Sequence, residues 1–199
     1  TLDFPQQKNL AQRLERMGYN CLTLEMEKVS QFFETVERVG IATSRQAAAD
    51  KLAFDLKRKL KRLSAKTAGM ERPEVLWVVQ RRPLRVAGKD TFVNELIELA
   101  GGVNAIGKTV HKYPPIGSEK VIASGADVII EPSMGATDIE VQKKQAMKFW
   151  SKFQNVPAVA NGRVCIIDGD TVSQLGPRLF EGVETIAKCL RPEMFESEK

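Results

Sequence analysis

Apolar residues that recur at every third or fourth position predict helices along much of this chain. Within residues 29–39, for example, Val29, Phe32 and Val36 would share one helical face. In residues 45–68 the apolar positions recur mostly at intervals of four, which predicts the longest helix. Helices are predicted for residues 5–17, 29–39, 45–68, 91–100, 119–123, 139–153 and 177–190.

Short apolar runs between these helices predict strands. Residues 75–79 read Val-Leu-Trp-Val-Val, which is typical of a strand covered on both faces. Strands are predicted for residues 21–25, 75–79, 127–130 and 164–167. Because strands alternate with helices, the sequence predicts an α/β fold in which a parallel sheet carries helices on both faces.

The composition narrows the classes of function. The 199 residues, 43% of them apolar, suit one domain or two small lobes with a core. The net charge of +5 permits an acidic partner without requiring one. The basic run in residues 57–66 contains no aromatic residue that could stack on bases. We therefore expect a solvated helix face and no nucleic acid partner, with a basic interaction module as an alternative.

Cysteine and histidine are too few and too scattered to indicate a metal site. Cys21, Cys165 and Cys189 are widely spaced, fit neither a metal-ligand set nor a disulfide framework, and are expected to be buried free thiols. The single histidine, His111, has no partner at ligand spacing. We expect no metal and no cofactor. No run approaches the ~20 apolar residues that span a bilayer.

One stretch matches the pattern of a phosphate-binding loop. The residues from Gly102 to Thr109 read G-x-x-x-x-G-K-T. Such a loop follows a strand and opens a helix, whereas here a predicted helix precedes the pattern and Pro114 and Pro115 follow it. Other catalytic templates, such as G-x-S-x-G, are absent. We therefore expect no catalytic residues, and we keep a nucleotide-dependent α/β enzyme that uses Gly102 to Thr109 as the alternative.

The order of motifs in residues 72–134 resembles the C-terminal lobe of a known family. The most specific stretches are Val-Ala-Gly-Lys-Asp-Thr-Phe-Val-Asn from Val86, Ser-Glu-Lys-Val-Ile-Ala from Ser118, Asp-Val-Ile-Ile from Asp127, and Gly-Pro-Arg-Leu from Gly176 with a later Arg-Pro. The family comprises the periplasmic substrate-binding proteins of ABC importers for iron chelates and cobalamin, of the ferric siderophore, haem and vitamin B12 type.

The resemblance implies a domain organisation. Residues 1–43 resemble a remnant of the N-terminal lobe, residues 44–70 an inter-lobe helix, and residues 71–199 a complete C-terminal α/β lobe. The family's N-terminal lobe normally begins with further strands and helices before the position that matches Thr1. The expectation from the resemblance is therefore an N-terminally truncated member of the family.

The resemblance also implies a nutrient carrier and not an enzyme. Such a protein binds a metal-chelate ligand (an iron siderophore, haem or cobalamin) in the cleft between its lobes and docks on the permease of an ABC importer. It is periplasmic or otherwise extracytoplasmic, peripheral to the membrane, and lipid-anchored in some members. This location is implied by the resemblance, because the chain itself contains no signal segment.

Candidate ligand contacts follow from the predicted sheet, because open α/β sheets bind ligands beyond the carboxyl ends of their strands. Each of the three C-terminal strands is followed by polar residues, and Tyr113 is the expected aromatic contact in the Pro-rich loop. The arginines could form forked hydrogen bonds with carboxylates, catecholates or phosphates, or could instead pair with a nearby carboxylate. The candidate ligand-binding residues are Gln80, Arg81, Arg82, Tyr113, Ser133, Met134 and Gln174.

Glu119 is the candidate for permease docking. It lies in the first turn of a short predicted helix, after Ser118, which is a natural N-cap. The helix dipole alone would also favour a glutamate there. In the cobalamin and siderophore binders that this chain resembles, a glutamate at the matching position pairs with arginines of the permease. The resemblance implies the same role for Glu119.

Overall fold

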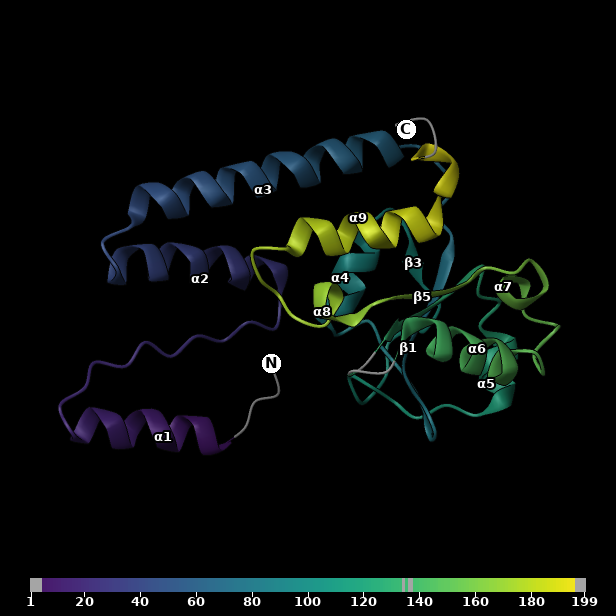
Figure 1. Cartoon of the computed structure of the whole chain (residues 1–199), viewed down its shortest axis with the longest axis horizontal. Helices are drawn as coiled ribbons and strands as arrows, with labels where there is room; N and C mark the ends of the chain where they lie inside the picture. Colours follow the sequence, from purple (N-terminus) through teal and green to yellow (C-terminus); the bar gives the residue numbers. More distant parts are fainter. Residues whose placement is uncertain (1–4, 134, 136–137, 196–199) are drawn as a thin grey trace. The chain divides into compact units, whose positions relative to one another are not determined.

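The computed structural model describes residues 5–133, 135 and 138–195 (Figure 1). The chain divides into two compact units, Thr1–Asp55 and Leu56–Lys199, and the division falls within its longest helix. Each unit is described by itself below.

The regular secondary structure in the described part of the first unit is helical. It contains α1 (Pro5–Arg16), α2 (Val29–Ala42) and the beginning of α3 (Gln46–Thr67). The Thr43 hydroxyl donates a hydrogen bond of 2.7 Å to the Val39 carbonyl and closes the end of α2. Gly40 allows α2 to approach α3, because a Cβ built there would lie only 2.5 Å from the Cβ of Ala49. The three helices predicted in this region are confirmed.

The strand predicted for residues 21–25 is wrong. These residues carry no regular secondary structure in this unit. A strand exists only where a neighbouring strand takes up its backbone hydrogen bonds. Among the described residues, every strand comes from residue 74 onward and belongs to the second unit. Alternating apolar residues therefore do not suffice to make a strand of this segment.

A mixed sheet is the centre of the second unit. Its strands are β1 (Glu74–Arg81), β2 (Leu84–Val86), β3 (Val103–Asn104), β4 (Val128–Ser133) and β5 (Val164–Asp168). The strand order is β2-β1-β4-β5, and β3 pairs with the beginning of β1. All pairs are parallel except the β1–β2 hairpin, which turns at the cis peptide bond between Arg82 and Pro83. The predicted parallel sheet is confirmed, and the hairpin is an addition that the sequence did not predict.

Helices cover both faces of this sheet, as predicted (Figure 1). One face packs its apolar side chains, among them Leu76 and Ile129, against Trp150 and Phe153. The helices on this side are α5 (Ser118–Ala123), α6 (Ile139–Trp150) and α7 (Pro157–Ala160). The other face carries α4 (Phe92–Leu99), α8 (Gly169–Val172) and α9 (Leu179–Leu190), and a 3-10 turn, η1 (Pro192–Met194), follows α9.

A buried arginine holds the end of α9 in place. Arg191 is only 6% exposed, and its Nη1 donates a hydrogen bond of 3.3 Å to the carbonyl of Gly101, just after α4. Its Nη2 donates to the carbonyl of Glu71, ahead of β1. One guanidinium therefore pairs with backbone carbonyls from two segments that lie far apart in the sequence. Without it, these carbonyls would lose a hydrogen-bond partner.

We predict that Gly182→Ala destabilises the second unit. In a helix interior alanine normally stabilises by about 1 kcal/mol relative to glycine. A Cβ at Gly182 of α9, however, would lie 2.6 Å from the backbone carbonyl oxygen of Thr171 in α8. We therefore expect a loss of about 1 to 3 kcal/mol in the free energy of unfolding, measured by urea denaturation.

Gly176→Ala is the matched control, because a Cβ there would meet no atom within 4 Å. Its unfolding free energy should stay within about 0.5 kcal/mol of the parent protein. A Gly182→Ala protein as stable as this control would contradict the close packing of α9 on α8.

Candidate ligand-binding site

The carboxyl ends of β1, β4 and β5 meet at one edge of the sheet, because these strands are parallel. Gln80 and Arg81 end β1, Ser133 ends β4, and Asp168 ends β5, where it pairs in register with Ser133. A buried carboxylate, Glu131, lies two residues before the end of β4. This edge is where the sequence placed the candidate ligand contacts.

Glu131 is the centre of a three-residue network at this edge. It is only 6% exposed, and its Oε1 accepts a hydrogen bond of 2.6 Å from the indole Nε1 of Trp150. Its Oε2 lies 3.3 Å from the Nε of Arg81. Burial raises the pKa of the Glu131 carboxyl, while the Trp150 hydrogen bond and the Arg81 charge lower it by less. The carboxylate therefore fixes the Arg81 guanidinium and the Trp150 indole in place.

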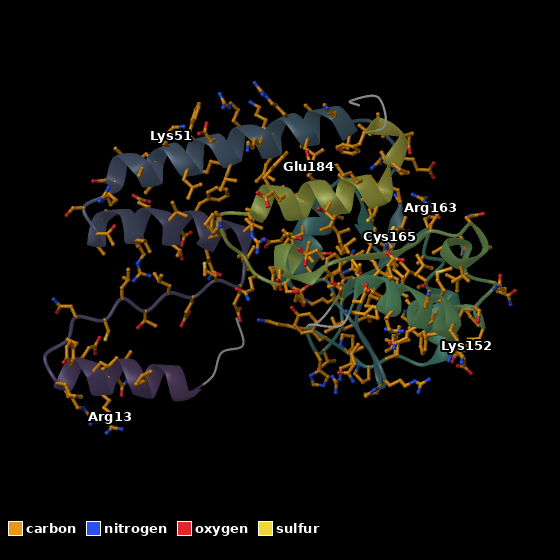
Figure 2. All side chains as sticks on the ribbon, viewed as in Figure 1. Arg13, Lys51, Lys152, Arg163, Cys165 and Glu184 are labelled. Atoms are coloured by element: carbon orange, nitrogen blue, oxygen red, sulfur yellow. The ribbon has the colours of Figure 1, made fainter. Side chains whose placement is uncertain are left out.

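A basic pocket of about 530 Å³ lies next to this network. The end of β1 supplies Arg81 and the turn after it Arg82, and α6 with the residues that follow it supplies the rest. The ammonium group of Lys152, labelled in Figure 2, lies 4.4 Å from the ring centroid of Phe149 and 4.9 Å from that of Phe153. The residues that line the basic pocket are Arg81, Arg82, Gln145, Lys148, Phe149 and Lys152.

Gln80 and Arg81 also line a smaller pocket. It measures about 150 Å³ and includes Glu131 and Pro132 of β4 and Gln142 of α6. The Gln80 side chain donates a hydrogen bond of 2.6 Å to the Arg82 carbonyl. Gln80 thus shapes the turn that presents the two arginines.

Three of the other predicted contacts, Tyr113, Ser133 and Gln174, are not part of the lining of these two pockets. Tyr113 is half-buried, and its carbonyl accepts a hydrogen bond of 3.1 Å from Arg85. The Ser133 hydroxyl accepts one of 3.3 Å from the backbone of Gly169, and Gln174 is exposed. Met134 lies outside the described residues.

Sequence reasoning missed the contribution of α6. Lys148 and Phe149 lie in the last turn of α6, and Lys152 follows that helix by two residues, so all three line the same pocket. Their proximity along the chain was visible in the sequence, but nothing indicated that the turn after β1 would lie opposite. Glu131 carried a signal of its own, since it is a lone carboxylate at the end of the apolar run that starts at Val128.

The stretch from Gly102 to Thr109 is not a phosphate-binding loop. It follows α4, contains β3, and is separated from the next helix, α5, by the Pro-rich loop. Gly102 itself is required for packing, because a Cβ there would lie 2.9 Å from the Leu190 side chain. The backbone N–H groups of a helix start, which bind phosphate in such loops, are missing from this position.

Glu119 is exposed in the first turn of α5. The N-cap expected at Ser118 is wrong: Gly117 occupies that position and Ser118 is the first helical residue. In the part of the chain that the structure describes, no group of three or more His, Cys, Asp or Glu side chains could hold a metal ion. None of the described helices has both the length and the apolar character of a membrane span.

A parallel sheet covered by helices, with a polar pocket at its carboxyl edge, defines an α/β binding domain. The sequence pattern of the periplasmic binding protein family matches residues 2–171, and the chain belongs to this family. This confirms the family resemblance. It also confirms the expectation of a binding protein in place of an enzyme, since the family is one of periplasmic binding proteins.

An uncharacterised ABC transporter substrate-binding lipoprotein of Bacillus subtilis (strain 168) is similar to this chain. It is 29% identical over 189 residues, which cover 92% of this chain and 58% of that protein. The chain therefore spans less than two thirds of the length of this relative.

Two solved structures share the fold. One is a possible iron-binding (periplasmic solute-binding) protein from Staphylococcus epidermidis, with a TM-score of 0.79 and 24% identity over 93% of this chain and 73% of that one. The other is the periplasmic vitamin B12 binding protein of Vibrio cholerae, with a TM-score of 0.77 and 20% identity over 94% and 71%. At these identities the likeness concerns the fold.

We predict that Glu131→Gln changes how stability depends on pH. Burial raises the pKa of Glu131 in the folded state above its pKa in the unfolded state. The contribution of Glu131 to the free energy of unfolding is therefore complete below the unfolded-state pKa, and it is lost as the pH rises through the folded-state pKa. Glutamine keeps an acceptor for Trp150 but does not titrate. The unfolding free energy of the parent protein, relative to that of Glu131→Gln, should therefore fall as the pH rises above about 4.3, the ordinary pKa of a glutamate.

Urea unfolding at several pH values measures this difference. Glu193→Gln, at an exposed position, reports the effect of losing a surface carboxylate. A difference for Glu131→Gln that grows with pH would mean that pairing with Arg81 outweighs burial, contrary to the prediction.

Proposed function

We propose that this chain is part of the substrate-binding component of an ABC importer for a metal chelate: a ferric siderophore, haem or cobalamin. The observation that carries the proposal is the basic and aromatic pocket at the carboxyl edge of the sheet, in a member of the periplasmic binding protein family. The B. subtilis relative is a substrate-binding lipoprotein, and the two solved proteins are named for iron and vitamin B12. We propose an extracytoplasmic location for this chain as well.

The size of the basic pocket suits such a ligand. Pockets for small molecules and cofactors usually measure about 300 to 1,000 Å³. The basic pocket, at about 530 Å³, falls in that range, whereas the smaller pocket of about 150 Å³ does not. We therefore propose that the ligand contacts the β1–β2 turn and α6.

The charges in the basic pocket favour the acidic chelates. The Oε2 of Glu131 lies 3.3 Å from the Nε of Arg81, and we propose that the terminal nitrogens of this guanidinium donate to a ligand carboxylate or catecholate. Arg82 and Lys148 add positive charge, and Phe149, with the Lys152 ammonium over its ring, adds aromatic surface to the lining. Haem carboxylates and ferric catecholates match this chemistry better than the neutral amides of cobalamin.

We predict that Arg82→Glu and Lys148→Glu each weaken the binding of an acidic chelate by tenfold or more, because reversal places like charges together. Haemin, a ferric tris-catecholate, a ferric hydroxamate and cyanocobalamin are titrated against the purified chain by fluorescence quenching. Lys61→Glu makes the same charge change at an exposed position on α3 outside the basic pocket and should leave the affinities unchanged.

The outcomes separate the function from the site. If none of the four chelates binds the chain or its Lys61→Glu control, this part of the protein does not hold a chelate site. If a chelate binds but Arg82→Glu and Lys148→Glu behave like Lys61→Glu, the ligand class stands and the basic pocket is not its site.

We further propose that Glu119 docks on the permease, as the family resemblance implies. The side chain is exposed at the start of α5 and is distant in sequence from the residues of the basic pocket. Exposed charges at an interface mainly steer association, and reversal adds repulsion to the lost attraction.

Glu119→Arg should therefore slow ligand-dependent association with the permease in membrane vesicles by about tenfold or more while chelate affinity stays unchanged. Glu193→Arg makes the same change at another exposed position and should leave docking intact. Unchanged docking of Glu119→Arg would assign the contact to other residues.

A further inference from the structure

Two thiols that the sequence treated as unrelated meet in the second unit. Cys165 lies in β5 and Cys189 in the last turn of α9, and the two thiols lie close enough for their side chains to interact. The expectation that the thiols are buried is wrong, since both are half-buried and therefore within reach of small reagents. Both are free in this structure.

A neighbouring contact holds the two segments in this approach. Arg163 precedes Cys165 by two residues, so both side chains project from the same face of the chain where it enters β5 (Figure 2 labels both). The Arg163 Nη2 donates a hydrogen bond of 2.7 Å to the carbonyl of Leu190, which adjoins Cys189. The thiol pair therefore lies beside an independent link between the same two segments.

We propose that Cys165 and Cys189 form a disulfide in an oxidising environment and thereby join α9 to the edge strand β5. The bond would close a loop that runs through β5, α8 and α9. Closing a loop of this size substantially lowers the conformational entropy of the unfolded chain. The inference concerns the chain's own thiols and is independent of any ligand. Disulfides persist outside the cytoplasm, which is where the proposed function places this chain.

The oxidation balances with a low-molecular-weight disulfide, such as oxidised glutathione, as the oxidant. The Cys165 thiolate attacks one glutathione sulfur, the S–S bond breaks, and one glutathione thiolate leaves. The Cys189 thiol then loses its proton to water and attacks the Cys165 sulfur of the mixed disulfide, which releases the second glutathione. Two protein thiols lose two electrons and two protons, and the oxidant becomes two thiols.

The local environment indicates which thiol reacts first. The side-chain interaction with Cys189, and to a lesser extent the charge of Arg163, lower the pKa of Cys165, although burial opposes them. The same interaction and burial raise the pKa of Cys189. Cys165 is therefore the thiol that becomes the attacking thiolate.

The test equilibrates the purified, fully reduced chain with glutathione buffers of increasing oxidising strength under native conditions. Of the three cysteines, one free thiol should remain. Peptide mapping without reductant should find the Cys165 and Cys189 peptides joined and lighter by two hydrogens. The oxidised protein should melt roughly 5 to 10 °C above the reduced protein.

Three variants make the assignment specific. Cys21→Ser is the matched control, because Cys21 lies in the first unit, and it should retain both the link and the rise in Tm. Cys165→Ser and Cys189→Ser should each lose both. Three free thiols at every potential, a link that includes Cys21, or glutathione adducts on Cys165 without a Cys165–Cys189 link would each overturn the proposal.

Discussion

The buried carboxylate of Glu131 is the interaction around which the ligand edge of the sheet is organised. A lone ionised carboxylate in an apolar strand is costly, and it is tolerated only where hydrogen bonds and an opposite charge compensate. Trp150 and Arg81 supply part of that compensation from α6 and from the end of β1, although burial still raises the Glu131 pKa. The same contacts fix the distance between these two elements, and the basic pocket lies between them. The electrostatics of one side chain thus determine the shape of the surface that a ligand would meet.

This arrangement also explains the asymmetry of the two arginines. Arg81 has one nitrogen engaged by Glu131 and is partly buried, so its orientation is set before any ligand arrives. Arg82 is exposed, and its backbone carbonyl accepts a hydrogen bond from the Gln80 side chain. We infer that Arg81 orients the ligand, and that Arg82 adds a positive charge whose position can adapt to the ligand. A site with both properties can accept related chelates whose acidic groups differ in position.

Much of the second unit could be predicted from the sequence, because its elements are long enough to show a period. The long helices and the three parallel strands β1, β4 and β5 begin and end within a few residues of their predicted bounds. The strands β2 and β3, with three and two residues, are too short to show alternation. The segment 21–25 has the right composition for a strand but lacks a neighbouring strand in its unit, and composition does not reveal a missing partner.

The candidate site was predicted only in part, for a similar reason. Arg81 and Arg82 could be named because the ends of parallel strands share an edge. Lys148, Lys152 and Phe149 could not, because their relation to that edge depends on how α6 crosses the sheet, and the Glu131–Trp150 contact fixes that crossing. The Cys165–Cys189 contact likewise depends on how α9 packs against the edge strand β5. The spacing of residues along the chain does not indicate this packing.

Arg191 has a topological consequence for the second unit. By binding the carbonyls of Glu71 and Gly101 together, it brings the segment that enters β1 next to the segment that leaves α9. The α/β lobe from residue 71 to residue 191 is therefore a loop of chain whose two ends meet at one guanidinium. A lobe closed in this way has the property that makes domains suitable for insertion or circular permutation: its ends can be joined by a short linker while the sheet order stays the same.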